Sequence, residues 1–215
     1  MVMIMKKLLV STVLGVLLMP LLFIVLFTLI GGEESGSGGN PNIIPNESQQ
    51  IFIDAVAPIA QETYKKYGVL PSITLAQAVL ESAWGQSGLT IQANNLFGIK
   101  ADPSWTGRVL EMETQEHVDG GIITIIARWR VYEKWEDSVT DHGMFLKENS
   151  RYAAAGFFEA KDYIGQAESL VKAGYATNPS YAKLLCSLIE SYGFNKYDQT
   201  GGCLLYTSPS PRDTR

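Results

Sequence analysis

The sequence predicts an α+β protein, in which a mostly helical domain carries one small β-hairpin lobe and follows a single transmembrane helix. Three observations lead to this fold class. Most of residues 46–198 has the apolar spacing of amphipathic helices. Residues 109–132 switch to the two-residue alternation of strands. Finally, the N-terminal region contains an uninterrupted apolar segment.

That apolar segment begins at Leu8, ends at Ile30 and contains no charged residue. As a helix it is roughly 34 Å long, enough to cross a bilayer. Two lysines precede it and two glutamates follow, so the positive-inside rule places the rest of the chain outside the cell membrane. A cleaved signal peptide is the alternative, but its apolar core is shorter and Ile30 makes a poor cleavage site. We therefore predict a cytoplasmic stub and uncleaved single-pass anchor over residues 1–32.

The remaining chain divides by composition. Residues 33–45 are rich in Gly, Ser, Asn and Pro, which is typical of a flexible linker. Residues 46–198 are long enough for one domain with its own core. Residues 199–215 break abruptly with the preceding pattern and resemble translated read-through, so this tail is left out of the fold prediction.

Charge and cysteine content disfavour several kinds of partner. The formal net charge is −5, and no basic cluster follows the N-terminal lysines, which argues against nucleic-acid binding. His117 and His142 are isolated, and no His/Cys cluster has metal-binding spacing, so neither a metal nor another cofactor is expected. Cys186 is expected to be a small buried residue, and Cys203 lies in the tail.

The folded region is expected to begin with two helices. Apolar residues at helical spacing predict the first over residues 49–67, capped by Asn46 or Ser48. Ser72 is the expected N-cap of the second, an alanine-rich helix that runs to about Trp84. A compact loop is predicted over residues 94–100.

A β-hairpin follows, with its turn at residues 119–121. Helical spacing then resumes at Ser138, which is the expected cap of a helix over residues 138–149. Two further helices are predicted over residues 160–173 and 180–192. A cleft between the helices and the hairpin is the natural site for a polymeric substrate.

Glu81 is the strongest catalytic candidate. It lies late in the second helix among apolar residues, and Trp84 at i+3 is expected to share its helix face. A carboxyl group shielded by an indole is partly desolvated, so its pKa rises into the range of a general acid. Gln77 lies one turn earlier and could bond either Glu81 or a sugar.

Hydrolysis of a glycoside needs a second carboxylate on the other side of the scissile bond. The predicted hairpin offers three, Glu111, Glu113 and Glu116. Glu116 lies just before the turn, but the local sequence does not choose among them.

Aromatic side chains stack on sugar rings, and eight are candidates for substrate contact: Trp84, Phe97, Trp105, Tyr132, Trp135, Tyr152, Tyr175 and Tyr181. Most aromatics at such spacing belong to a core, so three or four contacts are expected. Tyr175 is the best tyrosine candidate, because it follows a glycine in a loop between two helices and is expected to be exposed.

Several motifs together resemble the glucosaminidase family, glycoside hydrolase family 73. The resemblance covers residues 50–195 and rests on residues 52–58, 75–85, 95–100, 129–132 and 174–182. It implies a lysozyme-like fold and endo-type hydrolysis of the β-1,4 bond between N-acetylglucosamine and N-acetylmuramic acid in peptidoglycan. Glu81 matches the family's catalytic acid, Glu116 its second carboxylate and Tyr175 an active-site tyrosine. The predicted substrate-binding residues are Gln77, Trp84, Asn95, Phe97, Tyr132 and Tyr175.

Two other functions stay open from the sequence. One is a muramidase or lytic transglycosylase of the same fold, and the other is a catalytically silent cell-wall-binding module. In each case the expected partner is the glycan strand of peptidoglycan. A wall-spanning machine is a further possible partner, since a membrane-anchored enzyme could open the wall locally.

Overall fold

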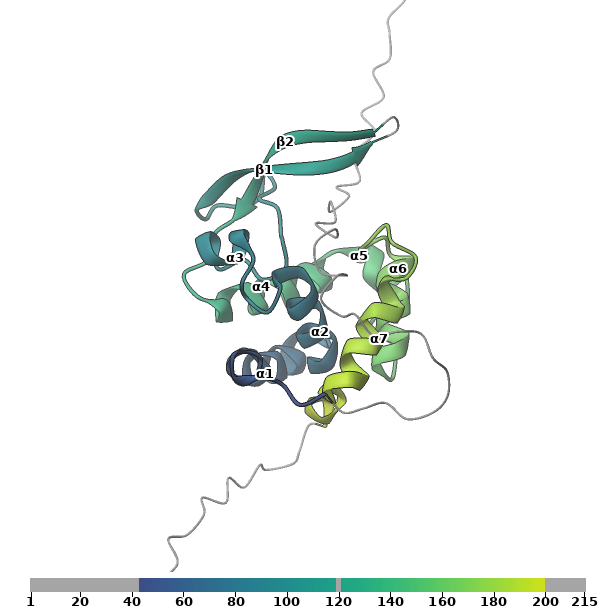
Figure 1. Cartoon of the computed structure of the whole chain (residues 1–215). Coiled ribbons are helices and arrows are strands. Elements are labelled where there is room, and N and C mark those ends of the chain that lie inside the picture. Colours follow the sequence, from purple (N-terminus) through teal and green to yellow (C-terminus); the bar gives the residue numbers. More distant parts are fainter. Residues whose placement is uncertain (1–42, 119–120, 200–215) are drawn as a thin grey trace, which may run out of the picture.

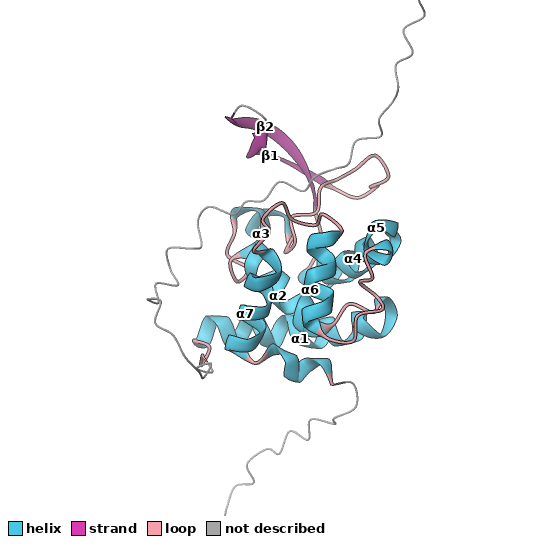
Figure 2. Cartoon of the chain, turned by 90° about the vertical axis from the view of Figure 1, so that its right-hand side faces the viewer, coloured by secondary structure: helices cyan, strands magenta, loops and turns pink. Residues whose placement is uncertain are grey.

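The computed structural model describes residues 43–118 and 121–199. Its helices form one body, and a two-stranded sheet projects from one end of it (Figures 1 and 2). The elements in order are α1 (Glu47–Tyr67), α2 (Pro71–Ser82), α3 (Gly88–Ala93), β1 (Val109–Val118), β2 (Gly121–Arg130), α4 (Trp135–Glu148), α5 (Ser150–Ala154), α6 (Tyr163–Lys172), α7 (Tyr181–Tyr192) and the 3₁₀ helix η1 (Phe194–Asp198). The predicted mixture of helices and one hairpin is confirmed.

The predicted membrane segment, residues 8–30, lies outside the described residues, as do most of the predicted linker and tail. Among the helices that are described, none combines the length and the apolar character needed to cross a bilayer.

Helix α2 is the centre of the helical body. Ten of its twelve residues are buried, and it contacts α1, α6, α7 and η1. A helix that is apolar on all sides is stable only when other elements surround it. Its small residues, such as Ala76 and Ala78, let the neighbouring helices approach closely. The C-terminal end of this central helix carries Glu81.

The first helix begins as predicted. Asn46 forms a capping box with Gln49, in which each side chain accepts a hydrogen bond from the other residue's backbone N–H. The start of α2 was predicted wrongly, because Ser72 lies inside the helix and Leu70 occupies the N-cap position. The Ser72 backbone N–H and hydroxyl both donate to the carboxylate of Asp198, at 2.8 and 2.6 Å. Asp198 of η1 therefore accepts a hydrogen bond from a backbone N–H in the first turn of α2, and local sequence could not reveal this partner.

The prediction for the start of α4 was also wrong. The helix begins at Trp135, and Ser138 is buried in its first turns. The Ser138 hydroxyl accepts a hydrogen bond from the backbone N–H of Leu96 at 3.1 Å. This serine thus holds the loop after α3 against α4. Three short elements, α3, α5 and η1, were not predicted, because segments of five or six residues are too short to show helical spacing.

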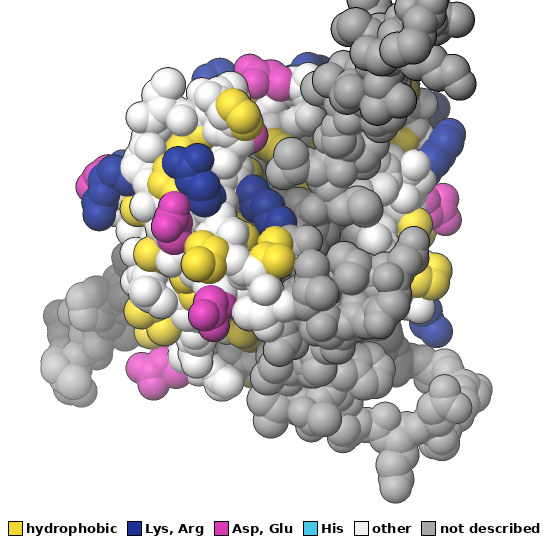
Figure 3. All heavy atoms as spheres, turned by 90° about the horizontal axis from the view of Figure 1, so that it is seen from above, with side chains coloured by type: hydrophobic (Ala, Val, Ile, Leu, Met, Phe, Trp, Pro, Cys, Tyr) yellow, Lys and Arg dark blue, Asp and Glu magenta, His cyan; other side chains and the backbone are white. Residues whose placement is uncertain are grey.

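The hairpin has the predicted position and an uninterrupted antiparallel register, from Val109 opposite Arg130 to Val118 opposite Gly121. One face of the sheet is the more buried: Thr114, Ala127 and Trp129 are buried there. Glu111 and Glu113 lie on the other, exposed face. On the face of the molecule seen from above, acidic and basic side chains are interspersed with apolar ones (Figure 3).

Candidate active site

The chain leaves α2 through a strained turn directly after Glu81. Ala83 and Trp84 both adopt left-handed backbone conformations, with φ of 51° and 61°, and Gly85 follows at 80°. A left-handed conformation costs about 1 kcal/mol for each residue that is not glycine. The prediction that α2 continues to Trp84 is therefore wrong, and so is the prediction that the indole shares a helix face with Glu81.

Packing and hydrogen bonds hold this turn in place. The Ser82 hydroxyl donates to the Ala78 carbonyl at 2.6 Å and accepts from the Gly85 backbone N–H at 2.7 Å. The Trp84 ring packs edge-on against Phe52 and against Tyr192 of α7. Trp84 thus anchors the residues that follow the candidate acid.

Tyrosine, rather than tryptophan, provides the partner of Glu81. The Tyr181 hydroxyl, at the start of α7, donates to Glu81 Oε1 at 2.9 Å. Gln77 donates from Nε2 to the same hydroxyl at 3.1 Å. Of its two predicted partners, Glu81 or a sugar, Gln77 therefore reaches Glu81 only through Tyr181. Sequence reasoning counted Tyr181 among eight aromatics but missed this contact.

Burial raises the pKa of Glu81 from 4.5 to about 7, and the hydrogen bond from Tyr181 opposes part of this rise. Desolvation favours the neutral carboxyl group because an anion loses more hydration than an acid does. A carboxyl group with a pKa near neutrality holds a proton that it can donate at physiological pH.

Tyr175 lies beside this pair and is buried, whereas the sequence predicted an exposed side chain. Its ring stacks on the ring of Tyr181, with centroids 5.6 Å apart. Burial, together with the nearby carboxyl group of Glu81, raises the pKa of Tyr175 well above its ordinary value. Its hydroxyl and Gln77 Oε1 are buried polar atoms without a hydrogen-bond partner among the described residues. Its predicted contact with substrate stays a prediction.

The structure places Glu116 in β1, paired with Ile123 near the end of the hairpin. Strand alternation assigns position 116 to the face that carries buried Thr114, and positions 111 and 113 to the exposed face. This separates the three carboxylates that the sequence left equivalent. The side chain of Glu116 lies outside the description, so its catalytic role stays a prediction.

Asn95 and Phe97 build the loop between α3 and the hairpin. Asn95 Nδ2 donates to the carbonyls of Ile99 and Arg130, at 2.9 and 3.0 Å. Phe97 stacks on His142 of α4, with ring centroids 3.9 Å apart. Both Asn95 and Phe97 are about 1 % exposed, so direct contact with a sugar stays a prediction without geometric support.

His142 is buried in this core, and burial lowers its pKa to about 3. The imidazole is therefore neutral at physiological pH. Within residues 43–118 and 121–199, no three His, Cys, Asp or Glu side chains come together as a metal site would need.

Tyr132 is also buried, and its hydroxyl donates to Asp141 at 2.6 Å. Trp105 packs edge-on against Tyr132, and Trp135 packs against Phe52. These aromatics join the hairpin base and α4 to the helical body. Substrate contact by Tyr132 remains a prediction.

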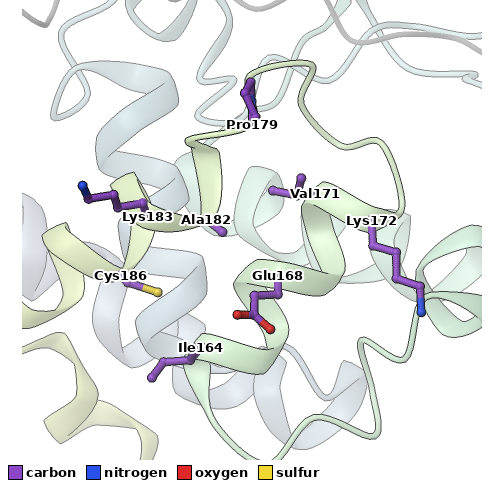
Figure 4. A pocket seen from close by; sticks show the side chains of 8 residues that line it. All are labelled: Ile164, Glu168, Val171, Lys172, Pro179, Ala182, Lys183 and Cys186. Carbon is purple, nitrogen blue, oxygen red and sulfur yellow. The ribbon is translucent and has the colours of Figure 1, made fainter.

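A hollow between α6 and α7 is lined by Ile164, Glu168, Val171, Lys172, Pro179, Ala182, Lys183 and Cys186 (Figure 4). None of these side chains belongs to the cluster around Glu81. The candidate active site is therefore the end of α2, where Glu81 meets Tyr181, and not this hollow.

A known protein family matches most of the described residues. Residues 57–194 match the sequence profile named Glucosaminidase, described as mannosyl-glycoprotein endo-beta-N-acetylglucosaminidase. The chain belongs to the glucosaminidase family. The match covers the helical body and the hairpin, from within α1 to the start of η1. The residues around Glu81 thus lie in a domain of glycoside hydrolase type.

Named relatives of this glucosaminidase domain include an exo-glucosaminidase, a peptidoglycan hydrolase and an autolysin. The chain is 40 % identical over 161 residues to exo-glucosaminidase LytG of Bacillus subtilis, a match covering 74 % of the chain and 56 % of LytG. It is 38 % identical to the peptidoglycan hydrolase FlgJ of Vibrio parahaemolyticus, covering 63 % of the chain and 45 % of FlgJ. The crystal structure of the catalytic domain of the autolysin Auto from Listeria monocytogenes superposes with a TM-score of 0.65 at 36 % identity, covering 73 % of the chain and 90 % of that domain. The chain spans about half the length of the curated relatives it matches.

The raised pKa of Glu81 predicts a pH-dependent stability. An unfolded glutamate loses its proton near pH 4.5, whereas the folded carboxyl group keeps it until about pH 7. The free energy of unfolding should therefore fall by about 3 kcal/mol as the pH rises through this window, and level off above it. Urea unfolding between pH 4 and 8 measures this. The Glu81→Gln variant should not show this decrease in the free energy of unfolding. The Glu148→Gln variant, changed at an exposed position of α4, should still show it. Identical curves for Glu81→Gln and the unmodified chain would contradict the burial of this charge.

The hydrogen bond from Tyr181 predicts how the pKa of Glu81 should change when the hydroxyl is removed. Tyr181→Phe removes a donor that favours the carboxylate, so the pKa of Glu81 should rise further, by about one unit. Carbon-13 NMR of the glutamate carboxyl groups measures this titration. Tyr163→Phe is the matched control, because it removes a hydroxyl that donates to Glu190 at the surface. An unchanged Glu81 titration in Tyr181→Phe shows that the contact does not tune the acid.

Proposed function

We propose that this chain is a peptidoglycan hydrolase that cleaves the β-1,4 bond between N-acetylglucosamine and N-acetylmuramic acid, with Glu81 as general acid. The single observation that carries the proposal is the partly buried carboxyl group of Glu81, which accepts a hydrogen bond from Tyr181 and whose pKa desolvation raises to about 7. Membership of the glucosaminidase family supports the type of bond, and the similarity to the peptidoglycan hydrolase FlgJ supports the substrate.

In this mechanism, protonated Glu81 donates its proton to the glycosidic oxygen as the bond to the sugar breaks. The Tyr181 hydroxyl, 2.9 Å from Glu81 Oε1, then stabilises the carboxylate that forms. Positive charge develops on the sugar ring at the same time. Either the carboxylate of Glu116 or the acetamide group of the substrate stabilises this charge, and water completes hydrolysis.

The roles of the carboxylates can be separated by substitution. Glu81→Gln should lower hydrolysis of purified peptidoglycan by about 1,000-fold without unfolding the domain, because general acid catalysis contributes 10²- to 10⁴-fold. Glu116→Gln should also lower the rate, whereas Glu111→Gln and Glu113→Gln, on the exposed face of the hairpin, should not. Release of soluble fragments measures the rate, and circular dichroism checks the fold. A Glu81→Gln variant that retains near wild-type activity excludes Glu81 as the acid.

Product analysis of the same digests tests the bond that is cut. Mass spectrometry should find N-acetylglucosamine at the reducing end of the fragments. Anhydro-muramic acid products would instead indicate a lytic transglycosylase, and reducing-end N-acetylmuramic acid a muramidase. An inactive chain that still sediments with peptidoglycan would indicate a wall-binding module. Fragment length distinguishes the endo-type cleavage predicted for this chain from the exo-type cleavage that the name of LytG describes.

We also infer that residues 8–30 anchor the enzyme to the outer side of the cell membrane. The uncharged length of this segment and the lysines before it support the inference. The full chain should stay with membranes after an alkaline wash, whereas a chain starting at residue 33 should be released. Equal release of both would contradict the anchor. Association with a wall-spanning machine stays a prediction.

A further inference from the structure

The hairpin is attached to the helical body mainly at its base. Among the described residues, no member of β1 or β2 belongs to the main hydrophobic core or packs directly against it. Figure 1 shows the two strands extending away from the helices. Apolar packing of the body therefore does not set the direction in which the hairpin points, and the contacts at its base must do so.

Backbone pairing makes the first of these contacts. Lys100 and Trp129 form an antiparallel bridge, and the Ala101 backbone N–H donates to the Arg128 carbonyl at 2.8 Å. The Arg130 backbone N–H donates to the Ile99 carbonyl at 3.1 Å. These bonds join β2 to the loop after α3, but they do not join it to any helix.

A buried polar cluster makes the connection to the helices. Arg130, the last residue of β2, donates from both its terminal nitrogens: to the two carboxylate oxygens of Asp141 in α4, at 3.0 and 2.8 Å, and to Asp102, at 2.6 Å. The Tyr132 hydroxyl also donates to Asp141, and the Arg130 guanidinium lies 4.8 Å from the Trp105 ring centroid. The side chains of Arg130 and Asp141 are only 9 % and 7 % exposed.

We propose that Asp141 is a positioning residue for catalysis, which acts by holding Arg130 so that β1 and position 116 keep one orientation relative to Glu81. The inference rests on the proposed function, in which Glu116 assists Glu81. Asp141 lies in the middle of α4, which packs against α1 and so belongs to the helical body. The ion pair between Arg130 and Asp141 therefore fixes the hairpin relative to the helical body.

The chemistry of the cluster suits this role. Nη1 of Arg130 bonds both oxygens of Asp141, and Nη2 bonds Asp102, so two carboxylates hold the planar guanidinium. Charge-assisted hydrogen bonds of this kind are short and directional, whereas apolar contacts tolerate sliding. Buried ion pairs contribute little net stability, because desolvation offsets their attraction, and one attested use for them is structural specificity. Two packed apolar side chains would stabilise the fold at least as well. The advantage of the ion pair over them is therefore its fixed geometry.

Electron–electron distance measurement tests the positioning directly. Spin labels at Ile126 of β2 and Ile51 of α1, both exposed, report the distance between hairpin and body. They are placed in the full chain after Cys186→Ser and Cys203→Ser. We expect a narrow distribution for the unmodified cluster and a broadened or shifted one for Asp141→Asn. Leu146→Ala, which opens a cavity in the same helix, is the control for lost stability and should keep the narrow distribution.

The catalytic arm uses the same variants without labels. Asp141→Asn should lower kcat by about 100-fold with little change in KM, since a displacement of about 1 Å in the reacting groups has an effect of this size. Leu146→Ala should keep kcat at temperatures where it is folded. Loss of activity in Asp141→Asn with an unchanged distance distribution overturns the proposal, as does a displaced hairpin with full activity.

If Asp141→Asn does not fold, Asp102→Asn provides the second test, because Asp102 is 30 % exposed and its loss is milder. Asp102→Asn should shift the distance between the two spin labels in the same direction as Asp141→Asn does, and it should lower kcat by a smaller factor. Unchanged distance in this variant as well would overturn the proposal. The distance measurement needs no activity, so its result is independent of whether the chain cleaves peptidoglycan.

Discussion

Desolvation of one carboxyl group at the end of a buried helix is the constraint on which the rest of the structure depends. Because α2 is surrounded by α1, α6, α7 and η1, its last turn offers Glu81 little water. The neutral acid is then favoured over the carboxylate, and the single hydrogen bond from Tyr181 only partly offsets this preference. A proton donor near neutral pH therefore follows from packing.

The turn after Glu81 shows how the same packing supports a local conformation that the sequence disfavours. Ala83 and Trp84 adopt left-handed conformations that glycine would take more readily. The Trp84 ring, held by Phe52 and Tyr192, provides the stabilisation that the backbone lacks. Strain of this kind is often found at functional sites, where the surroundings fix a residue that would otherwise relax. Different interactions hold the two parts of the site. Apolar packing holds Glu81, whereas the polar cluster around Arg130 and Asp141 holds the hairpin.

Local sequence predicted the elements whose signals are local. The N-cap of α1, for which Asn46 was one of two candidates, the hairpin and the helix that became α7 were all expected at nearly their observed positions. The predictions for Ser72, Ser138 and Tyr175 failed for one reason. Each side chain contacts a residue from a separate part of the chain, Asp198, Leu96 and Tyr152 respectively, so its capping or exposure tendency was overridden.

The sequence by itself determined the order of the longer helices and the two strands, the apolar surroundings of Glu81 and the motifs that assign the chain to the glucosaminidase family. Only the tertiary structure decided which groups touch that carboxyl group. Its partner Tyr181 lies 100 residues away, and the ion pair at the base of the hairpin joins β2 to α4. Such contacts form when separate elements pack together, and periodicity within one element carries no information about them.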